Sequence, residues 1–173
     1  LRNADILFQI GLQLEMWAPQ IIDGSRNSDL RIVYLSDEIS PKEIPTTKVD
    51  ASMGDVHPNG NPHYWLDPNN AKIMANEIYN ELSLQSPEND SFFKKNLDAY
   101  IKKLDNKIIE WEGKMSKLKQ KEIIFFHSSW IYFADRFGIK IAGYVEPKPG
   151  IPPTPSHNAE IIQLIKKKNI KLI

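Results

Sequence analysis

The sequence predicts an α/β fold in which two Rossmann-like lobes with parallel sheets are joined by one long helix. Strand-like apolar runs alternate with helix-like patterns in the first part of the chain and again in the last part. This order implies parallel strands connected by right-handed crossovers. Between the two parts, apolar residues recur at steps of three and four over roughly 30 residues, which would form a helix on the order of 45 Å long.

The composition excludes several classes of protein. The 173 residues include 22 Lys and Arg against 22 Asp and Glu, so no basic surface for nucleic acid is expected. The chain has no cysteine, which leaves histidines and carboxylates as the good ligands for a transition metal. No stretch approaches the roughly 20 apolar residues of a membrane-spanning helix.

The first lobe is predicted over residues 1–86 and is expected to lack its beginning. A strand at residues 6–10, a helix at residues 14–22 and a strand at residues 31–35 form one strand–helix–strand unit. Residues 36–61 are rich in proline and glycine and show little periodicity, which predicts a long loop. Loops of this length are usually functional or mobile.

Two helix starts follow this loop. Asp67 can cap a helix whose first position is Pro68, and this helix is predicted to run to residue 83. Ser86 and Pro87 repeat the pattern and start the long helix.

The long helix is predicted as a separate unit over residues 87–119. Its apolar stripe runs from Phe93 to Leu118 without interruption. Such a stripe could form a coiled-coil arm or a helix that spans two lobes. Its position between two α/β segments favours the spanning helix.

The second lobe is predicted over residues 120–173 and is expected to be incomplete, because the chain stops inside its last strand. Ser128 or Ser129 can cap its first helix, Gly138 closes that helix, and Ser156 can cap the second one. The predicted strands cover residues 123–126, 139–145 and 170–173, the predicted helices residues 130–137 and 156–168, and a stiff proline-rich loop residues 146–155.

Two histidines are candidate metal ligands. His63 lies in a turn stiffened by Pro62, although histidines beside aromatic residues are often structural. His127 and Glu146 both stand at the carboxyl ends of predicted strands, where α/β sheets bind ligands. His127 could instead merely cap its strand, but one histidine from each lobe is the arrangement that lets a metal join two lobes.

Other polar residues are weaker candidates. His57 is close enough in sequence to His63 to supply another nitrogen, or it is a solvated loop histidine. Asp50 and Asp55 share its loop, which leads to the hypothesis that residues 36–61 gather or hand over metal. His157 is expected at the surface, in the first turn of a helix.

Four motifs in the same order resemble the zinc- and manganese-binding solute-binding proteins of metal ABC importers. A fifth segment, EPKPGIPP at residues 146–153, resembles one branch of that family. The four motifs are ADI at residues 4–6, GLQLEMW at 11–17, NPHYWLDP at 61–68 and FHSSWIY at 126–132.

The resemblance implies two α/β lobes joined by a rigid helix, with a metal held between them by histidines and a carboxylate. His63 and His127 match the second and third ligands of that family. The first histidine would lie before residue 4 and the acidic ligand beyond Ile173, so these residues alone do not make a four-ligand site.

The expected cargo is zinc, because neutral imidazoles favour zinc over the more oxygen-seeking manganese, which is the alternative within the family. Binding requires deprotonated imidazoles, so affinity should fall as the pH drops through the ordinary histidine range near 6.5. The resemblance implies a monomer, either periplasmic or anchored to the outer face of the cytoplasmic membrane, that delivers metal to a membrane permease.

Two other functions are compatible with the same residues. A zinc-dependent hydrolase would use an open metal position to activate water, with Glu146 as a possible general base. A surface adhesin would keep the fold with a purely structural metal.

Overall fold

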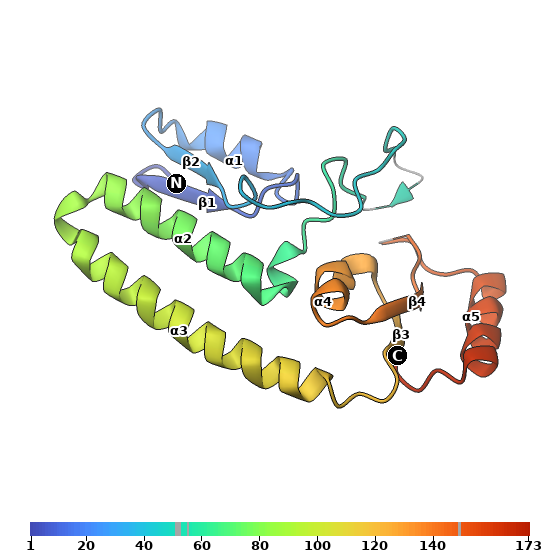
Figure 1. Ribbon diagram of the computed structural model, residues 1–173. Helices are drawn as coiled ribbons and strands as arrows, with labels where there is room; N and C mark the ends of the chain where they lie inside the picture. Colours follow the sequence, from blue (N-terminus) through green and yellow to red (C-terminus); the bar gives the residue numbers. More distant parts are fainter. Residues whose placement is uncertain (51–52, 55, 149) are drawn as a thin grey trace.

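The computed structural model describes residues 1–50, 53–54, 56–148 and 150–173. It confirms a mixed α/β fold with two small parallel sheets and a long helix (Figure 1). A first α/β unit leads into an antiparallel pair of helices, and the second helix of the pair runs from the first unit to a second α/β unit. Within the described residues, no helix has both the length and the apolar character needed to cross a membrane.

The first unit consists of β1 (Ile6–Gln9), α1 (Ala18–Ser25) and β2 (Arg31–Tyr34), and its two strands are parallel. The helix begins four residues later than the predicted residue 14. Positive φ angles at residues 11–13 turn the chain first. The carboxylate of Glu15 then accepts hydrogen bonds from the backbone N–H groups of Ile10 and Gly11, at 2.7 and 3.0 Å.

The helix pair confirms one predicted start and corrects another. In α2 (Pro68–Gln85), Asp67 Oδ1 accepts a hydrogen bond of 2.9 Å from the backbone N–H of Asn69, as the capping prediction requires. Before α3 (Asp90–Met115), Ser86 precedes a short 3₁₀ turn, η3 (Pro87–Asn89), and its side chain does not cap the backbone.

The end of α3 also differs from the prediction. The apolar stripe continues to Leu118, yet the helix stops at Met115. The backbone N–H groups of Lys117 and Leu118 donate to carbonyls three residues earlier, both at 3.2 Å. These tighter turns replace the four-residue spacing of an α-helix and end it.

The second unit contains β3 (Glu122–Phe125), η4 (Ser128–Trp130), α4 (Ile131–Arg136), β4 (Lys140–Tyr144) and α5 (Pro155–Lys168), with β3 and β4 parallel. Gly138 follows the end of α4 with φ +63°, as predicted, but the N-cap predictions here are wrong. Ser128 and Ser129 lie inside the 3₁₀ turn η4. Thr154 caps α5 in place of Ser156, because Pro155 takes the first helical position.

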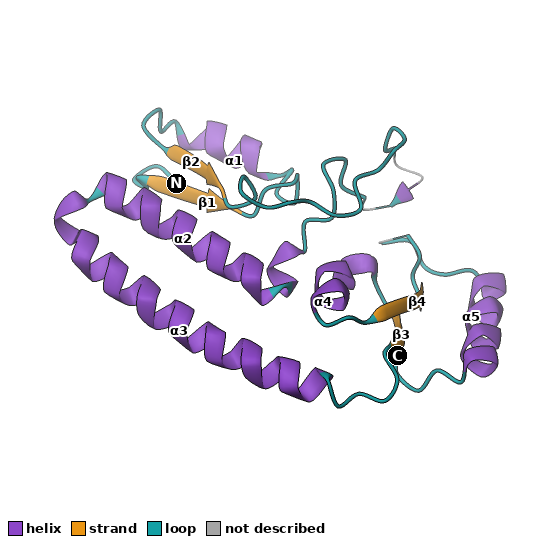
Figure 2. Ribbon diagram, viewed as in Figure 1, coloured by secondary structure: helices purple, strands orange, loops and turns teal. Residues whose placement is uncertain are grey.

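The predicted last strand is also wrong. Among the described residues, 170–173 form no strand, although the backbone N–H of Ile124 donates to the carbonyl of Leu172 at 3.3 Å. One hydrogen bond orders the segment beside β3 without forming a ladder. Most of the described part of residues 36–61 is loop, as predicted (Figure 2).

A buried cluster connects the two units. Ile39 from the long loop, Tyr64 and Tyr132 from α4 are between 0 and 6% exposed and pack together. The rings of Tyr64 and Tyr132 meet edge to face, with centroids 6.5 Å apart. Two other clusters lie within the second unit, around Ala134 and around Ile124.

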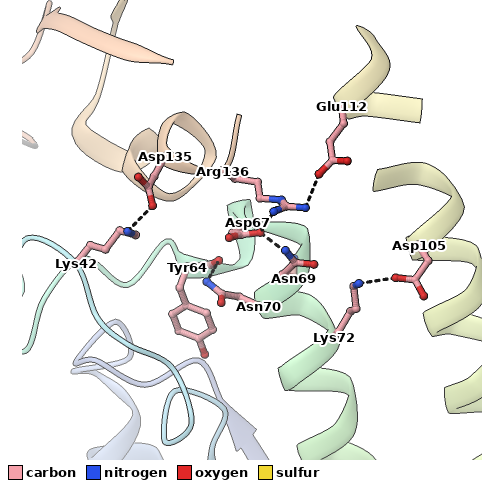
Figure 3. Close-up of polar contacts among 10 residues, drawn as sticks. All are labelled: Lys42, Tyr64, Asp67, Asn69, Asn70, Lys72, Asp105, Glu112, Asp135 and Arg136. Atoms are coloured by element: carbon pink, nitrogen blue, oxygen red, sulfur yellow. Dashed lines mark hydrogen bonds and ion pairs between the residues drawn. The ribbon is translucent and has the colours of Figure 1, made fainter. Parts of the chain in front are cut away.

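Ion pairs add to the contacts between helices (Figure 3). Lys72 of α2 pairs with Asp105 of α3. Arg136 at the end of α4 lies 2.6 Å from Glu112 of α3. Lys42 of the long loop lies 2.6 Å from Asp135 of α4. Together with the buried cluster, the pairs of Arg136 with Glu112 and of Lys42 with Asp135 hold the second unit against α3 and the loop.

Candidate metal centre

A cavity of about 450 Å³ lies where the first unit's long loop meets the second unit. It brings together all three histidines that the sequence singles out as ligand candidates. Its lining residues are Glu43, Val56, His57, Asn61, Pro62, His63, His127, Ser128, Ser129, Tyr144, Pro147 and Gly150.

The contacts described for His63 come from Asn61 in its own loop. It immediately precedes the 3₁₀ turn η2 (Tyr64–Leu66). Its backbone N–H donates to Asn61 Oδ1 at 3.0 Å, and its ring Nδ1 lies 2.9 Å from the same oxygen. Because a carboxamide oxygen is only an acceptor, Nδ1 is the donor in this contact, and in the neutral ring Nε2 then carries the lone pair that a metal can bind.

His127 follows β3 in extended backbone geometry, with φ −110° and ψ 161°. Its Nδ1 contacts a carboxylate oxygen of Glu146, which follows β4 and is 8% exposed. This is an ion-pair contact at Nδ1, and Nε2 is the other ring nitrogen that a metal could bind. Glu146 therefore lies against the histidine ring, which differs from the general-base position considered for a hydrolase.

The remaining candidates divide into two groups. His57 lines the cavity, whereas Asp50 does not, and Asp55 lies outside the described residues. His157 was expected at the surface, but it is half-buried and its Nε2 lies 2.9 Å from the carbonyl of Tyr144. This contact joins α5 to β4. His157 is not among the residues that line the cavity.

Sequence reasoning missed several residues of the site. Asn61 belongs to the NPHYWLDP motif but is not among the predicted site residues, although its position two residues before His63 suits an Asx turn. Glu43 and Tyr144 carry no local pattern that marks them. Burial raises the pKa of Tyr144 to about 12, so its phenol stays neutral at the edge of the cavity.

The donor set suits a soft or borderline metal but is incomplete. Two imidazoles, one from each side of the chain's long helix, line one cavity, and the Nδ1 of each lies against an oxygen, of Asn61 for His63 and of Glu146 for His127. In the part of the chain that the structure describes, no group of three His, Asp or Glu side chains is placed to hold a metal ion. A complete centre needs donors besides His63 and His127.

Comparisons with known proteins show the family to which the chain belongs. A family profile described as "ZnuA: Zinc-uptake complex component A periplasmic" matches residues 1–173. The high-affinity zinc uptake system protein ZnuA of Brucella abortus is 38% identical over 104 residues, which are 60% of this chain and 31% of that protein. The zinc-binding lipoprotein AdcA of Streptococcus pneumoniae is 25% identical across 100% of this chain and 35% of its own length.

Solved structures show the same architecture. A crystal structure of ZnuA superposes with a TM-score of 0.77 at 24% identity, covering 97% of this chain and 60% of that one. The AdcAII protein of Streptococcus pneumoniae gives a TM-score of 0.76 at 27% identity, covering 98% of this chain and 60% of that one. The present chain thus spans between a third and three fifths of the relatives described here. With the family profile matched along its whole length, the chain belongs to the ZnuA family, the periplasmic component A of zinc-uptake complexes.

Proposed function

We propose that the protein captures a divalent transition metal, zinc by preference, with His63 and His127 in the cavity between its two α/β units. The metal is then delivered to the membrane permease of an ABC importer. The observation that carries the proposal is one cavity lined by both His63 and His127, each with Nδ1 against an oxygen atom. The capture takes place outside the cytoplasm, in the periplasm or at the outer face of the membrane, and the protein works as a monomer.

Zinc suits these donors better than manganese does. Imidazole nitrogen binds zinc at about 2.0–2.1 Å, and zinc sites are completed by one or two further donors. Manganese prefers carboxylate and carbonyl oxygen. Among the relatives, the lipoprotein PsaA of Streptococcus pneumoniae is named for manganese, at 24% identity over 97% of this chain and 54% of its own length, so manganese is the second candidate. We place the remaining ligands in the full-length protein, outside these 173 residues, with His57 as a candidate within them.

Metal titration of the full-length protein tests this proposal. The wild type should bind one zinc ion, and His63→Ala or His127→Ala should each weaken binding by orders of magnitude, because each removes a nitrogen that binds the metal directly. His157→Ala is the matched control, since His157 is not among the residues that line the cavity and its ring contacts a backbone carbonyl, and it should bind as the wild type does. Unchanged binding in both cavity variants would show that these histidines are structural.

Two other functions can be separated from metal capture. Zinc-dependent hydrolysis of ester or phosphoester substrates would identify an enzyme, but the contact of Glu146 with His127 argues against a general base there. A mutant of the laminin-binding adhesin Lmb of Streptococcus agalactiae superposes with a TM-score of 0.77 at 26% identity, covering 98% of this chain and 61% of that one. Laminin binding that survives removal of metal would favour an adhesin.

A further inference from the structure

We propose that Asn61 is the positioning residue of the metal centre: its carboxamide oxygen selects the tautomer of His63, and its amide nitrogen ties the His63 loop to the backbone beside His127. This inference rests on the proposed function, because it concerns how the two histidines are prepared for metal.

The orientation of the Asn61 carboxamide follows from its partners. The atom that faces the backbone N–H of His63 at 3.0 Å must be an acceptor, so it is the oxygen. The nitrogen at the other end donates to the carbonyl of Ser128 at 2.9 Å and to a carboxylate oxygen of Glu43 at 2.8 Å. All these contacts agree with one orientation, so the amide is not ambiguous.

The oxygen acts on the ring of His63. It lies 2.9 Å from Nδ1, and two acceptors at that distance would repel each other, so Nδ1 is the nitrogen that carries hydrogen. The neutral ring then presents its lone pair at Nε2. Without this contact, either tautomer of the imidazole could form, and a ring protonated at Nε2 would have to exchange its proton before binding a metal there.

The amide nitrogen acts between the two sides of the cavity. Ser128, whose carbonyl accepts its hydrogen bond, is the neighbour of His127 in the chain. One short side chain therefore contacts the ring of one proposed ligand and the backbone next to the other. The asparagine carboxamide offers both an acceptor and two donors in a small group. An ionised aspartate has no donor and leucine has neither, so neither of them could make both contacts.

The backbone of Asn61 is itself held on both sides. Its N–H donates to the carbonyl of Lys42 and its carbonyl accepts from the hydroxyl of Tyr132, both at 2.8 Å. Gly60 before it has φ +108°, and a Cβ at that position would lie 3.0 Å from the carbonyl oxygen of Lys42. Pro62 after it is fully buried. The carboxamide thus extends from a fixed main chain, which is what a positioning residue requires.

The test compares Asn61→Ala with Asn70→Ala in the full-length protein. Asn70 is the matched control because its amide nitrogen also donates to a backbone carbonyl, that of Tyr64 in η2, at 2.9 Å. The ¹⁵N chemical shifts of the imidazoles in metal-free protein report the tautomer, and zinc titration at neutral pH reports affinity. Thermal melts of each variant measure any general loss of stability.

We expect the wild type and Asn70→Ala to hold His63 with hydrogen on Nδ1. In Asn61→Ala the form with hydrogen on Nε2 should appear, and zinc affinity should fall by about 10- to 100-fold, as is usual when an outer-shell partner of a metal ligand is lost. An Asn61→Asp and Glu43→Gln double variant should keep the wild-type tautomer and recover part of the affinity relative to Asn61→Ala. It retains the acceptor, and Glu43→Gln removes the repulsion between the two carboxylates.

Wild-type tautomer and affinity in Asn61→Ala would overturn the inference, as would a loss of affinity no larger than that of Asn70→Ala. Failure of the proposed function would look different. The wild type would then take up no zinc, whereas the change of tautomer in Asn61→Ala would still be visible in metal-free protein and would support the orienting role.

Discussion

The hydroxyl of Tyr132 lies where the two α/β units meet. It accepts a hydrogen bond from the backbone N–H of Lys42 and donates one to the carbonyl of Asn61, both at 2.8 Å. The residue is 1% exposed, so both backbone groups depend on this phenol in a place that water does not reach. One atom from α4 thereby fixes the loop that carries His63.

Removing that atom should destabilise the protein without leaving a large cavity. Tyr132→Phe should lower the free energy of unfolding by about 1–3 kcal/mol, the usual cost of leaving buried backbone groups without partners. Tyr100→Phe, on a side chain of α3 that is 45% exposed, should stay within about 0.5 kcal/mol of the wild type. Urea denaturation measures both.

The difference in stability between the wild type and Tyr132→Phe should depend on pH. Burial raises the pKa of Tyr132 in the folded protein above its unfolded value of about 10. A raised folded-state pKa means that the stabilisation is complete below pH of about 10 and is lost as the pH rises further, because the unfolded chain ionises first. The difference in the free energy of unfolding between wild type and Tyr132→Phe should therefore shrink between about pH 9 and pH 11. This range is roughly one unit on either side of the unfolded-state pKa. A constant gap would contradict this assignment.

Neither Asn61 nor Tyr132 could be assigned its role from the sequence. The hydroxyl of Tyr132 contacts residues 71 and 90 positions away, and Asn61 reaches across 67 positions to Ser128. Local patterns carry no information about such distant partners. The Asp67 cap was predictable because its acceptor and its donor lie two residues apart.

At the scale of elements, α3 is the longest helix in the described part of the chain, and it connects the two α/β units. Its existence and type were predictable, because a stripe with a 3.6-residue period over this length has no other simple explanation. Its end was not, because the apolar pattern continues into turns whose hydrogen bonds join residues three apart. Apolar periodicity indicates which side of a segment is buried, but it does not report where the backbone leaves the helix.

Two adjacent isoleucines of α3 test how this helix is anchored. Ile108 is 6% exposed and Ile109 is 68% exposed. Ile108→Ala should cost about 2–4 kcal/mol of unfolding free energy, since it removes packed methyl groups and leaves a cavity, whereas Ile109→Ala should change it by less than about 0.5 kcal/mol. Chemical denaturation of both variants gives the comparison. Equal costs would mean that α3 does not pack against its neighbours as described.

At the scale of the whole molecule, the proposed centre depends on contacts between units that are far apart in sequence. Tyr132, Asn61 and the Lys42–Asp135 pair bring the second unit against the long loop. His63 and His127 then line one cavity. The sequence suggested both histidines, from strand ends and a stiff turn, but the shared cavity required the three-dimensional arrangement.

The most direct test is a crystal structure of the full-length protein with zinc, using anomalous diffraction at the zinc edge. The account predicts one strong peak in the cavity, within about 2.0–2.1 Å of Nε2 of both His63 and His127. A peak bound to only one of these histidines, or a zinc ion held elsewhere with the cavity empty, would contradict it.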